Sequence, residues 1–225
     1  MQGADQGGGA VTDLLELTGV ILYAAPINEY DRRLVILTRE RGRISAFAKG
    51  VRRPTSSMVG AANPFVFGTF YFYEGRSSYT LKHVEVKAFF DTLKDDLDKL
   101  CYASYFTELA DYYSKENLTD PDLLNLLYLA FRTLEKDLIP QQLCRYIFEL
   151  RLLAIEGEYT EKPPVETGES AAYAWQYVLT SPLGKLFGFT LNEPALTEFC
   201  RAVEILRRRM IEVKFHSLEI LESLS

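Results

Sequence analysis

The sequence predicts an α+β protein, in which a small β-barrel is followed by an all-α domain. Two observations lead to this prediction. Before Phe89 the apolar residues alternate with a period of two, and after it they recur with a period of 3.6. The β part holds several short apolar segments separated by turns, and no segment there has the pattern of a crossover helix. Short strands without crossover helices, within about 75 residues, predict a small closed barrel.

Five strands are expected in the barrel. Turn residues separate them, including an Asn in the first turn, Gly42 after the second strand and a Gly-, Pro- and Ser-containing loop after the third. A five-stranded oligonucleotide/oligosaccharide-binding (OB) type barrel fits this pattern, and an SH3-like barrel fits it as well. The expected strands are residues 15–25, 33–38, 43–49, 65–73 and 79–88.

Helices are expected from Leu97 onwards. Asp120-Pro121 is a typical helix start, and Pro140 opens a further helix that Gly157 ends. The expected helices cover residues 97–109, 123–138, 141–156, 170–179, 194–213 and 217–224. We therefore divide the chain into a disordered leader at 1–12, an OB-type domain at 13–88 and a helical domain at 89–225, with a polar loop at 158–169.

Composition excludes several classes of protein. The chain has 225 residues, of which 48% are hydrophobic and 25% are charged, as in ordinary globular proteins. No apolar run is long enough to span a membrane, and residues 1–10 lack the features of a secretory signal. Cys101, Cys144 and Cys200 are odd in number and widely spaced, which predicts free buried thiols in a reducing cytoplasm.

Charge is distributed unevenly along the chain. The formal net charge is −6, but residues 11–88 hold 11 basic and 7 acidic residues, whereas residues 89–225 hold 14 basic and 23 acidic ones. Within residues 30–54 there are 8 basic and 2 acidic residues. This asymmetry favours a nucleic-acid contact through the barrel and disfavours one through the helices.

The basic segment is the strongest candidate site. The period of two in the third strand places Arg43, Phe47 and Lys49 on one face, and a face of cations and an aromatic ring suits single-stranded nucleic acid. The alternative is a solvated rim with Phe47 turned into the core. The candidate DNA-binding residues are Arg39, Arg41, Arg43, Lys49, Arg52 and Arg53, with Arg32, Arg33 and Phe47 in support.

Other features favour structural roles. The six aromatic residues of segment 65–73 are expected to fill the barrel, and Arg207-Arg208-Arg209 is expected to be a solvated helix end. There is no phosphate-binding P-loop, and neither His83 nor His216 belongs to a catalytic motif. These observations predict a protein that is not an enzyme and has no cofactor.

The ordered motifs resemble those of the RecO family. They are the Glu29–Thr38 segment, Arg41-Gly42-Arg43, then Ala48-Lys49-Gly50 with Arg52-Arg53, and later segments 105–109, 148–153 and 215–221. Many members carry a four-cysteine zinc motif after the 148–153 helix, and residues 158–169 contain no cysteine here. The resemblance therefore implies a zinc-free variant whose loop is held by packing.

The resemblance also implies a function. Members of the family bind single- and double-stranded DNA, anneal complementary strands and, with RecR, displace single-strand-binding protein and load RecA. The basic barrel residues named above would then contact DNA, and the acidic helical domain would dock partners. Two alternatives remain open: a protein-interaction adaptor whose basic segment only steers encounters, and a nuclease, which would need an acidic metal-binding cluster that the sequence does not show. Charge reversal of Arg41 and Arg43 is expected to lower DNA affinity with thermal stability nearly unchanged.

Overall fold

The barrel closes in the order expected of an OB-type fold. The computed structural model describes residues 14–76 and 78–224, so the predicted leader at 1–12 lies outside the described residues. Within that part of the chain five strands form one closed barrel in the order β1-β2-β3-β5-β4, and β1 also pairs with β4. The strands are β1 (Leu15–Ile27), β2 (Asp31–Thr38), β3 (Gly42–Ala48), β4 (Phe67–Glu74) and β5 (Tyr79–Ala88). The predicted fold class is therefore confirmed, and the strand order favours the OB-type barrel over the SH3-like alternative.

The long strand β1 serves both halves of the barrel. Its first part, Leu15–Val20, pairs with β4, and Gly19–Ile27 pairs with β2. All neighbouring strands are antiparallel except β3 and β5, which are joined by a short parallel pairing. Inward-facing side chains fill the interior, and they include Leu34, Ile36 and the stacked rings of Phe70 and Phe72.

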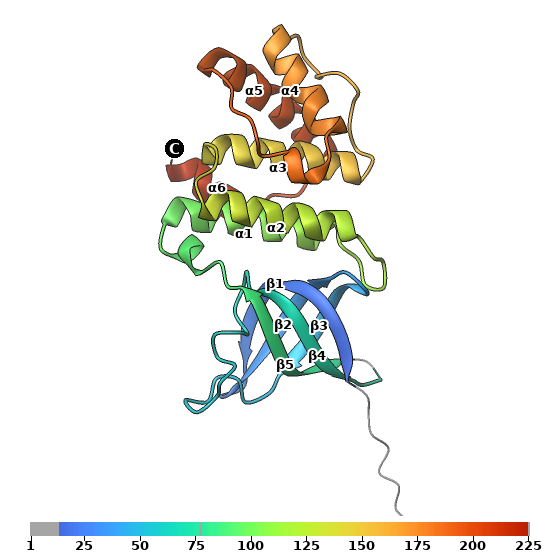
Figure 1. The fold of residues 1–225 in the computed structure, drawn as a ribbon, viewed down its shortest axis with the longest axis vertical. Coiled ribbons are helices and arrows are strands. Elements are labelled where there is room, and N and C mark those ends of the chain that lie inside the picture. Colours follow the sequence, from blue (N-terminus) through green and yellow to red (C-terminus); the bar gives the residue numbers. More distant parts are fainter. Residues whose placement is uncertain (1–13, 77, 225) are drawn as a thin grey trace, which may run out of the picture.

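The helical domain lies at one end of the barrel (Figure 1). It consists of η1 (Asp91–Lys94), α1 (Leu97–Tyr113), α2 (Pro121–Glu135), α3 (Gln141–Ile155), α4 (Glu169–Thr180), η2 (Leu183–Lys185), α5 (Glu193–Met210) and α6 (His216–Leu224). Side-chain caps begin three of these helices: Asp96 accepts from Lys99 N, Asp120 from Leu123 N and Asn192 from Ala195 N. Its apolar core continues onto the outer surface of the barrel through Val20, Leu22 and Leu37.

A backbone bridge also joins the two domains. The turn between β2 and β3 meets the connection between α1 and α2, where Arg43 N donates to Lys115 O at 3.1 Å and Asn117 N donates to Arg41 O at 3.0 Å. Gly42 forms an isolated β-bridge with Glu116 between these two bonds. The barrel and the helices are therefore connected by hydrogen bonds as well as by apolar packing.

The loop before α4 is held without cysteines. Trp175 Nε1 donates to Thr160 O at 3.0 Å, Gln176 Nε2 donates to Glu161 O, and Val165 packs on the helical core. The three cysteines are free and buried. Among the described residues no helix is long and apolar enough to cross a membrane.

Two expectations about packing are corrected by the structure. The fourth strand begins at Phe67 and not at residue 65, because Phe65 has a φ of 73° and its ring turns toward Phe131 of α2. Arg207 does not belong to a solvated helix end: it is 7% exposed and donates to Glu204 at 2.6 Å. Arg208 is exposed, as expected for a helix end.

Candidate nucleic-acid interface

The outer face of β1, β2 and β3 carries aromatic and cationic side chains in adjacent rows. Tyr23 pairs with Val35, which pairs in turn with Ser45. In the next row Ala25 pairs with Arg33, and Arg33 pairs with Phe47. Arg33 is exposed and Phe47 is half-buried. We call the side chains of Tyr23, Arg33 and Phe47 the aromatic platform.

The alternation predicted for β3 is confirmed. Ile44, Ala46 and Ala48 are buried in the barrel, whereas Phe47 faces outward. The alternative in which Phe47 fills the core is therefore wrong. Arg33 Nε donates to Ser45 Oγ at 3.0 Å, and this bond holds the guanidinium group against the sheet beside the Phe47 ring.

Basic side chains gather at the barrel end where β3 terminates. Lys49, Arg52 and Arg53 are exposed there, and the guanidinium carbon of Arg53 lies 5.4 Å from the centre of the Tyr30 ring. Asp31 Oδ1 accepts a hydrogen bond from Gly50 N at 2.7 Å, which fixes the start of this loop next to the turn between β1 and β2. We call Lys49, Arg52 and Arg53 the loop cluster.

Three further predicted cations, Arg39, Arg41 and Arg43, lie at the opposite end of β2. Arg39 is exposed, and its side chain forms no ion pair or hydrogen bond with the residues described. Arg41 lies 3.6 Å from Glu74, and Arg43 donates to Asp111 of α1 at 2.9 Å. Because β2 spans Asp31–Thr38, the two groups of cations are separated by roughly 25 Å. The basic segment therefore forms two clusters with the aromatic platform between them.

Two of the predicted arginines, Arg32 and Arg43, are half-buried and have structural contacts. Arg32 donates to Ala62 O at 2.8 Å and to Asn63 Oδ1 at 2.6 Å, so it anchors the loop before β4. Burial, and secondarily the charge of Arg52, lowers the pKa of Arg32. Arg43 connects the two domains through Asp111, and its charge reversal would bring two carboxylates together. The expectation that this variant leaves thermal stability nearly unchanged is therefore replaced by an expected loss.

Sequence reasoning did not identify Tyr23. This side chain is 60% exposed, and the register of β1 against β2 shifts between Ile21 and Tyr23. A β-bulge redirects a side chain in this way. Strict alternation along β1 places Tyr23 on the inward face, so only the position of the irregularity could have revealed it.

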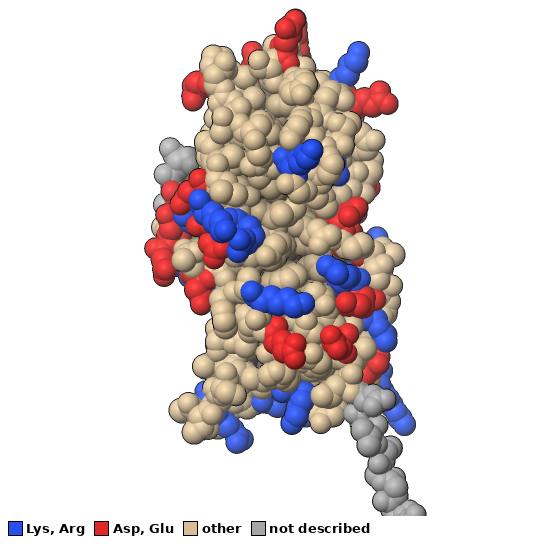
Figure 2. All heavy atoms as spheres, in the orientation of Figure 1, with Lys and Arg blue, Asp and Glu red and all other residues tan. Residues whose placement is uncertain are grey.

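Basic side chains also gather at one edge of the barrel in the space-filling view. Figure 2 shows Lys and Arg side chains along the lowermost edge of the barrel, with acidic side chains above them. Phosphates are attracted to the barrel end, and flat unpaired bases can stack on the exposed rings. In the described part of the chain no group of three or more His, Cys, Asp or Glu residues is placed to hold a metal ion.

Comparison with known proteins gives one consistent family. Residues 13–90 match the family described as Recombination protein O N terminal, and residues 94–161 match Recombination protein O C terminal. The DNA repair protein RecO of Alkaliphilus metalliredigens is 32% identical over 73% of this chain and 67% of its own length. The proteins of the same name from Acetivibrio thermocellus and Clostridium perfringens are 25% and 26% identical, each over 93% of this chain, and over 97% and 98% of their own lengths.

Proposed function

Because this chain belongs to the RecO family of DNA repair proteins, we propose that it is a DNA-binding recombination mediator and not an enzyme. In this proposal it binds single- and double-stranded DNA and anneals complementary strands. Together with RecR it helps to load RecA onto DNA that is coated with single-strand-binding protein. It would act in the bacterial cytoplasm at the nucleoid.

The aromatic platform is the observation that carries DNA binding. An exposed ring stacks on a base with roughly 1–3 kcal/mol, whatever the base, and cations beside it neutralise the phosphates. Tyr23 and Phe47 flank Arg33 on one open sheet face, and the loop cluster continues the positive charge beyond it. This combination supports a single strand lying across β1, β2 and β3.

The predicted contact residues take different parts in the proposal. Arg33, Lys49, Arg52, Arg53 and Phe47 would contact the strand at the platform and the loop cluster. A second group would bind phosphates at the other end of β2 or support that end, and it comprises Arg39, Arg41 and Arg43. Arg32 would support the end of β2 next to the loop cluster, where it anchors the loop before β4.

Anisotropy titration of a labelled single-stranded oligonucleotide at two salt concentrations tests the proposal. Lys49→Glu is the test variant, and Lys185→Glu is its control, because both lysines are exposed and Lys185 lies in η2 of the helical domain. We expect Lys49→Glu to weaken binding about tenfold at low salt and to reduce the salt slope by about 1–2, since reversal removes one phosphate contact and adds repulsion. Lys185→Glu should leave both quantities unchanged.

One result would overturn the proposed DNA binding, and a second would overturn the place of the loop cluster in it. Absent or salt-insensitive binding by the unmodified protein would favour the adaptor alternative. Equal effects of Lys49→Glu and Lys185→Glu would remove the loop cluster from the site. A strand-annealing assay with and without RecR then tests the mediator role separately from simple binding.

A further inference from the structure

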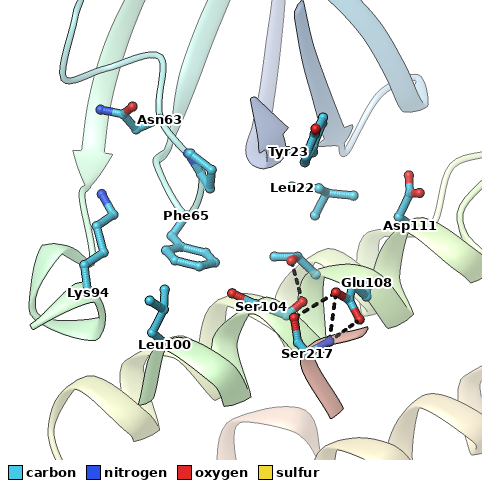
Figure 3. A pocket seen from close by; sticks show the side chains of 12 residues that line it. Leu22, Tyr23, Asn63, Phe65, Lys94, Leu100, Ser104, Glu108, Asp111 and Ser217 are labelled. Atoms are coloured by element: carbon cyan, nitrogen blue, oxygen red, sulfur yellow. Dashed lines mark hydrogen bonds between the residues drawn. The ribbon is translucent and has the colours of Figure 1, made fainter. Parts of the chain in front are cut away.

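A cleft between the barrel and the helical domain adjoins the aromatic platform. It has a volume of about 760 Å³, within the range of roughly 300–1,000 Å³ that is usual for small-molecule sites. Tyr23 lines this cleft as well as belonging to the platform. Figure 3 shows Leu22 and Tyr23 on the β1 side, Phe65 entering from the loop before β4, and Ser104 and Asp111 on α1.

We propose that this cleft receives an unpaired base of the DNA strand bound on the barrel, with a preference for bases that carry an amino group. The inference rests on the proposed DNA binding and adds a base-specific subsite to it. Its ligand class is a nucleobase with an exocyclic amino group, as in cytosine or adenine.

The apolar part of the cleft suits a flat base. Leu22 and Phe65 are buried, with 4% and 3% exposure, and they line the cleft together with Leu100 of α1. Phe65 is held in place by its backbone, because its N donates to Ile21 O at 2.9 Å while φ is 73°. A bulky residue with this φ is strained, and such strain persists only where the surroundings impose it.

The polar part of the cleft favours a base that carries a hydrogen-bond donor. Asp111 Oδ1 accepts from Arg43 at 2.9 Å, and its other carboxylate oxygen has no hydrogen-bond partner among the described residues. A carboxylate accepts hydrogen bonds from base amino groups, as in contacts to the N4 amino group of cytosine. Glu108, the other acidic residue of the lining, is already bonded through its carboxylate to Ser217 N and Oγ.

Charge distinguishes a base from other occupants. The lining holds the carboxylates of Glu108 and Asp111 and one ammonium group, that of Lys94, which already pairs with Asp91 at 2.8 Å. Because the one cation of this lining is already paired, the sugar–phosphate backbone would remain on the cationic barrel face. Only the uncharged base would enter the cleft. Tyr23 connects the two places, since it can stack on the neighbouring base at the entrance.

The test compares the affinities for dC and dT homopolymers of equal length at pH 7.5. Thymine has the carbonyl O4 where cytosine has an amino group, so we expect the unmodified protein to prefer dC by about fivefold. Asp111→Asn should abolish the preference for dC, because it removes the carboxylate that accepts from the amino group, and should raise affinity for dT, because it removes a negative charge beside Arg43.

A second variant fills the cleft. Ser104→Phe should lower dC affinity to the level of dT and leave dT affinity unchanged. Ser170→Phe is the matched control, since Ser170 also lies on a helix and lines a separate groove next to α4. Thermal unfolding of both variants identifies any loss caused by misfolding.

The outcomes separate this inference from the proposed function. Equal affinities for dC and dT in the unmodified protein would overturn the base subsite and leave DNA binding standing. If Ser104→Phe leaves the affinities for dC and dT unchanged, the base subsite is also overturned. A cleft that holds a protein segment would give this result. Absence of binding to either oligonucleotide would overturn both.

Discussion

Gly42 joins the two domains, and replacing it tests how much this joint contributes to stability. Its φ is 63°, and a Cβ at this position would lie 2.2 Å from Leu118 O and 2.4 Å from Lys115 O. Both contacts are with backbone atoms, so the bridge must open to admit a methyl group. The left-handed conformation costs an alanine roughly 1–2 kcal/mol, and the two bridging hydrogen bonds contribute about 1 kcal/mol each. Gly42→Ala should therefore lower the free energy of unfolding by about 3–4 kcal/mol.

Gly157→Ala provides the matched control. Gly157 has a φ of 77°, and no atom lies within 4 Å of the Cβ position that a substitution would create. This variant should show only the conformational cost, roughly 1–2 kcal/mol. Urea denaturation followed by circular dichroism measures both variants, with the slope checked for a change in cooperativity. Equal losses in Gly42→Ala and Gly157→Ala would refute the argument, because the steric clash and the bridge would then contribute nothing.

Three further predictions concern a titrating carboxyl group, the helical core and the aromatic platform. Burial, with the neighbouring Asp120, raises the pKa of Glu156 to about 7, so the folded state holds this proton more tightly than the unfolded chain. The folded state is therefore destabilised at a pH above 7, where this carboxyl group must ionise. Glu156→Gln should stabilise by about 1–2 kcal/mol at pH 8, after allowance for screening by solvent, and by little at pH 4.5. Arg207→Leu should destabilise by about 2–3 kcal/mol in urea denaturation, because it removes two charge-assisted hydrogen bonds from Glu204 and leaves Glu149 and Glu204 to share Arg145. Arg208→Leu should change stability by less than about 1 kcal/mol, because Arg208 is exposed. Tyr23→Ala should weaken single-stranded binding in anisotropy titrations about fivefold or more and weaken duplex binding less, since paired bases cannot stack on the ring.

Each of these predictions has a contrary result. A gain in Glu156→Gln that is the same at pH 4.5 and pH 8 would show that the carboxyl group does not titrate in this range. Glu166→Gln serves as the control substitution, since Glu166 is exposed. Similar stabilities of Arg207→Leu and Arg208→Leu would contradict the buried ion pairs. Equal losses for single strands and duplexes in Tyr23→Ala would show that the ring does not stack on bases.

The fold could be predicted because its signals are local. The change of hydrophobic period near Phe89 separates a barrel from helices, and this change depends only on residues that are close in sequence. Asp120 with Pro121 begins a helix for an equally local reason, the cap to Leu123 N at 2.9 Å. Strand order is a long-range property: the parallel pairing of Ala46 with Tyr79 distinguishes the barrel types, and no local pattern encodes it.

The site could be predicted less completely, because its contacts join distant parts of the chain. The basic segment was recognised, but charge alone does not reveal that Arg43 pairs with Asp111, 68 residues further on. Arg32 likewise binds the loop 30 residues away through Ala62 O. Buried Arg207 shows the same limit, since a run of three arginines resembles a solvated helix end until the contact with Glu149 of α3 is known.

The helical domain also determines how much of the sheet face is open to DNA. Leu37 at one end of β2 is fully buried against the helical core, and Arg43 beside it is paired with α1. The open rows therefore run from Tyr23 to the loop cluster, which is only part of the length of β2. OB folds bind roughly 4–16 nucleotides, and a face shortened in this way should correspond to the lower end of that range. If the site is complete on the barrel, affinity should stop increasing once an oligonucleotide exceeds about six nucleotides. A continued increase to sixteen would show that the strand extends past the loop cluster or over the helices.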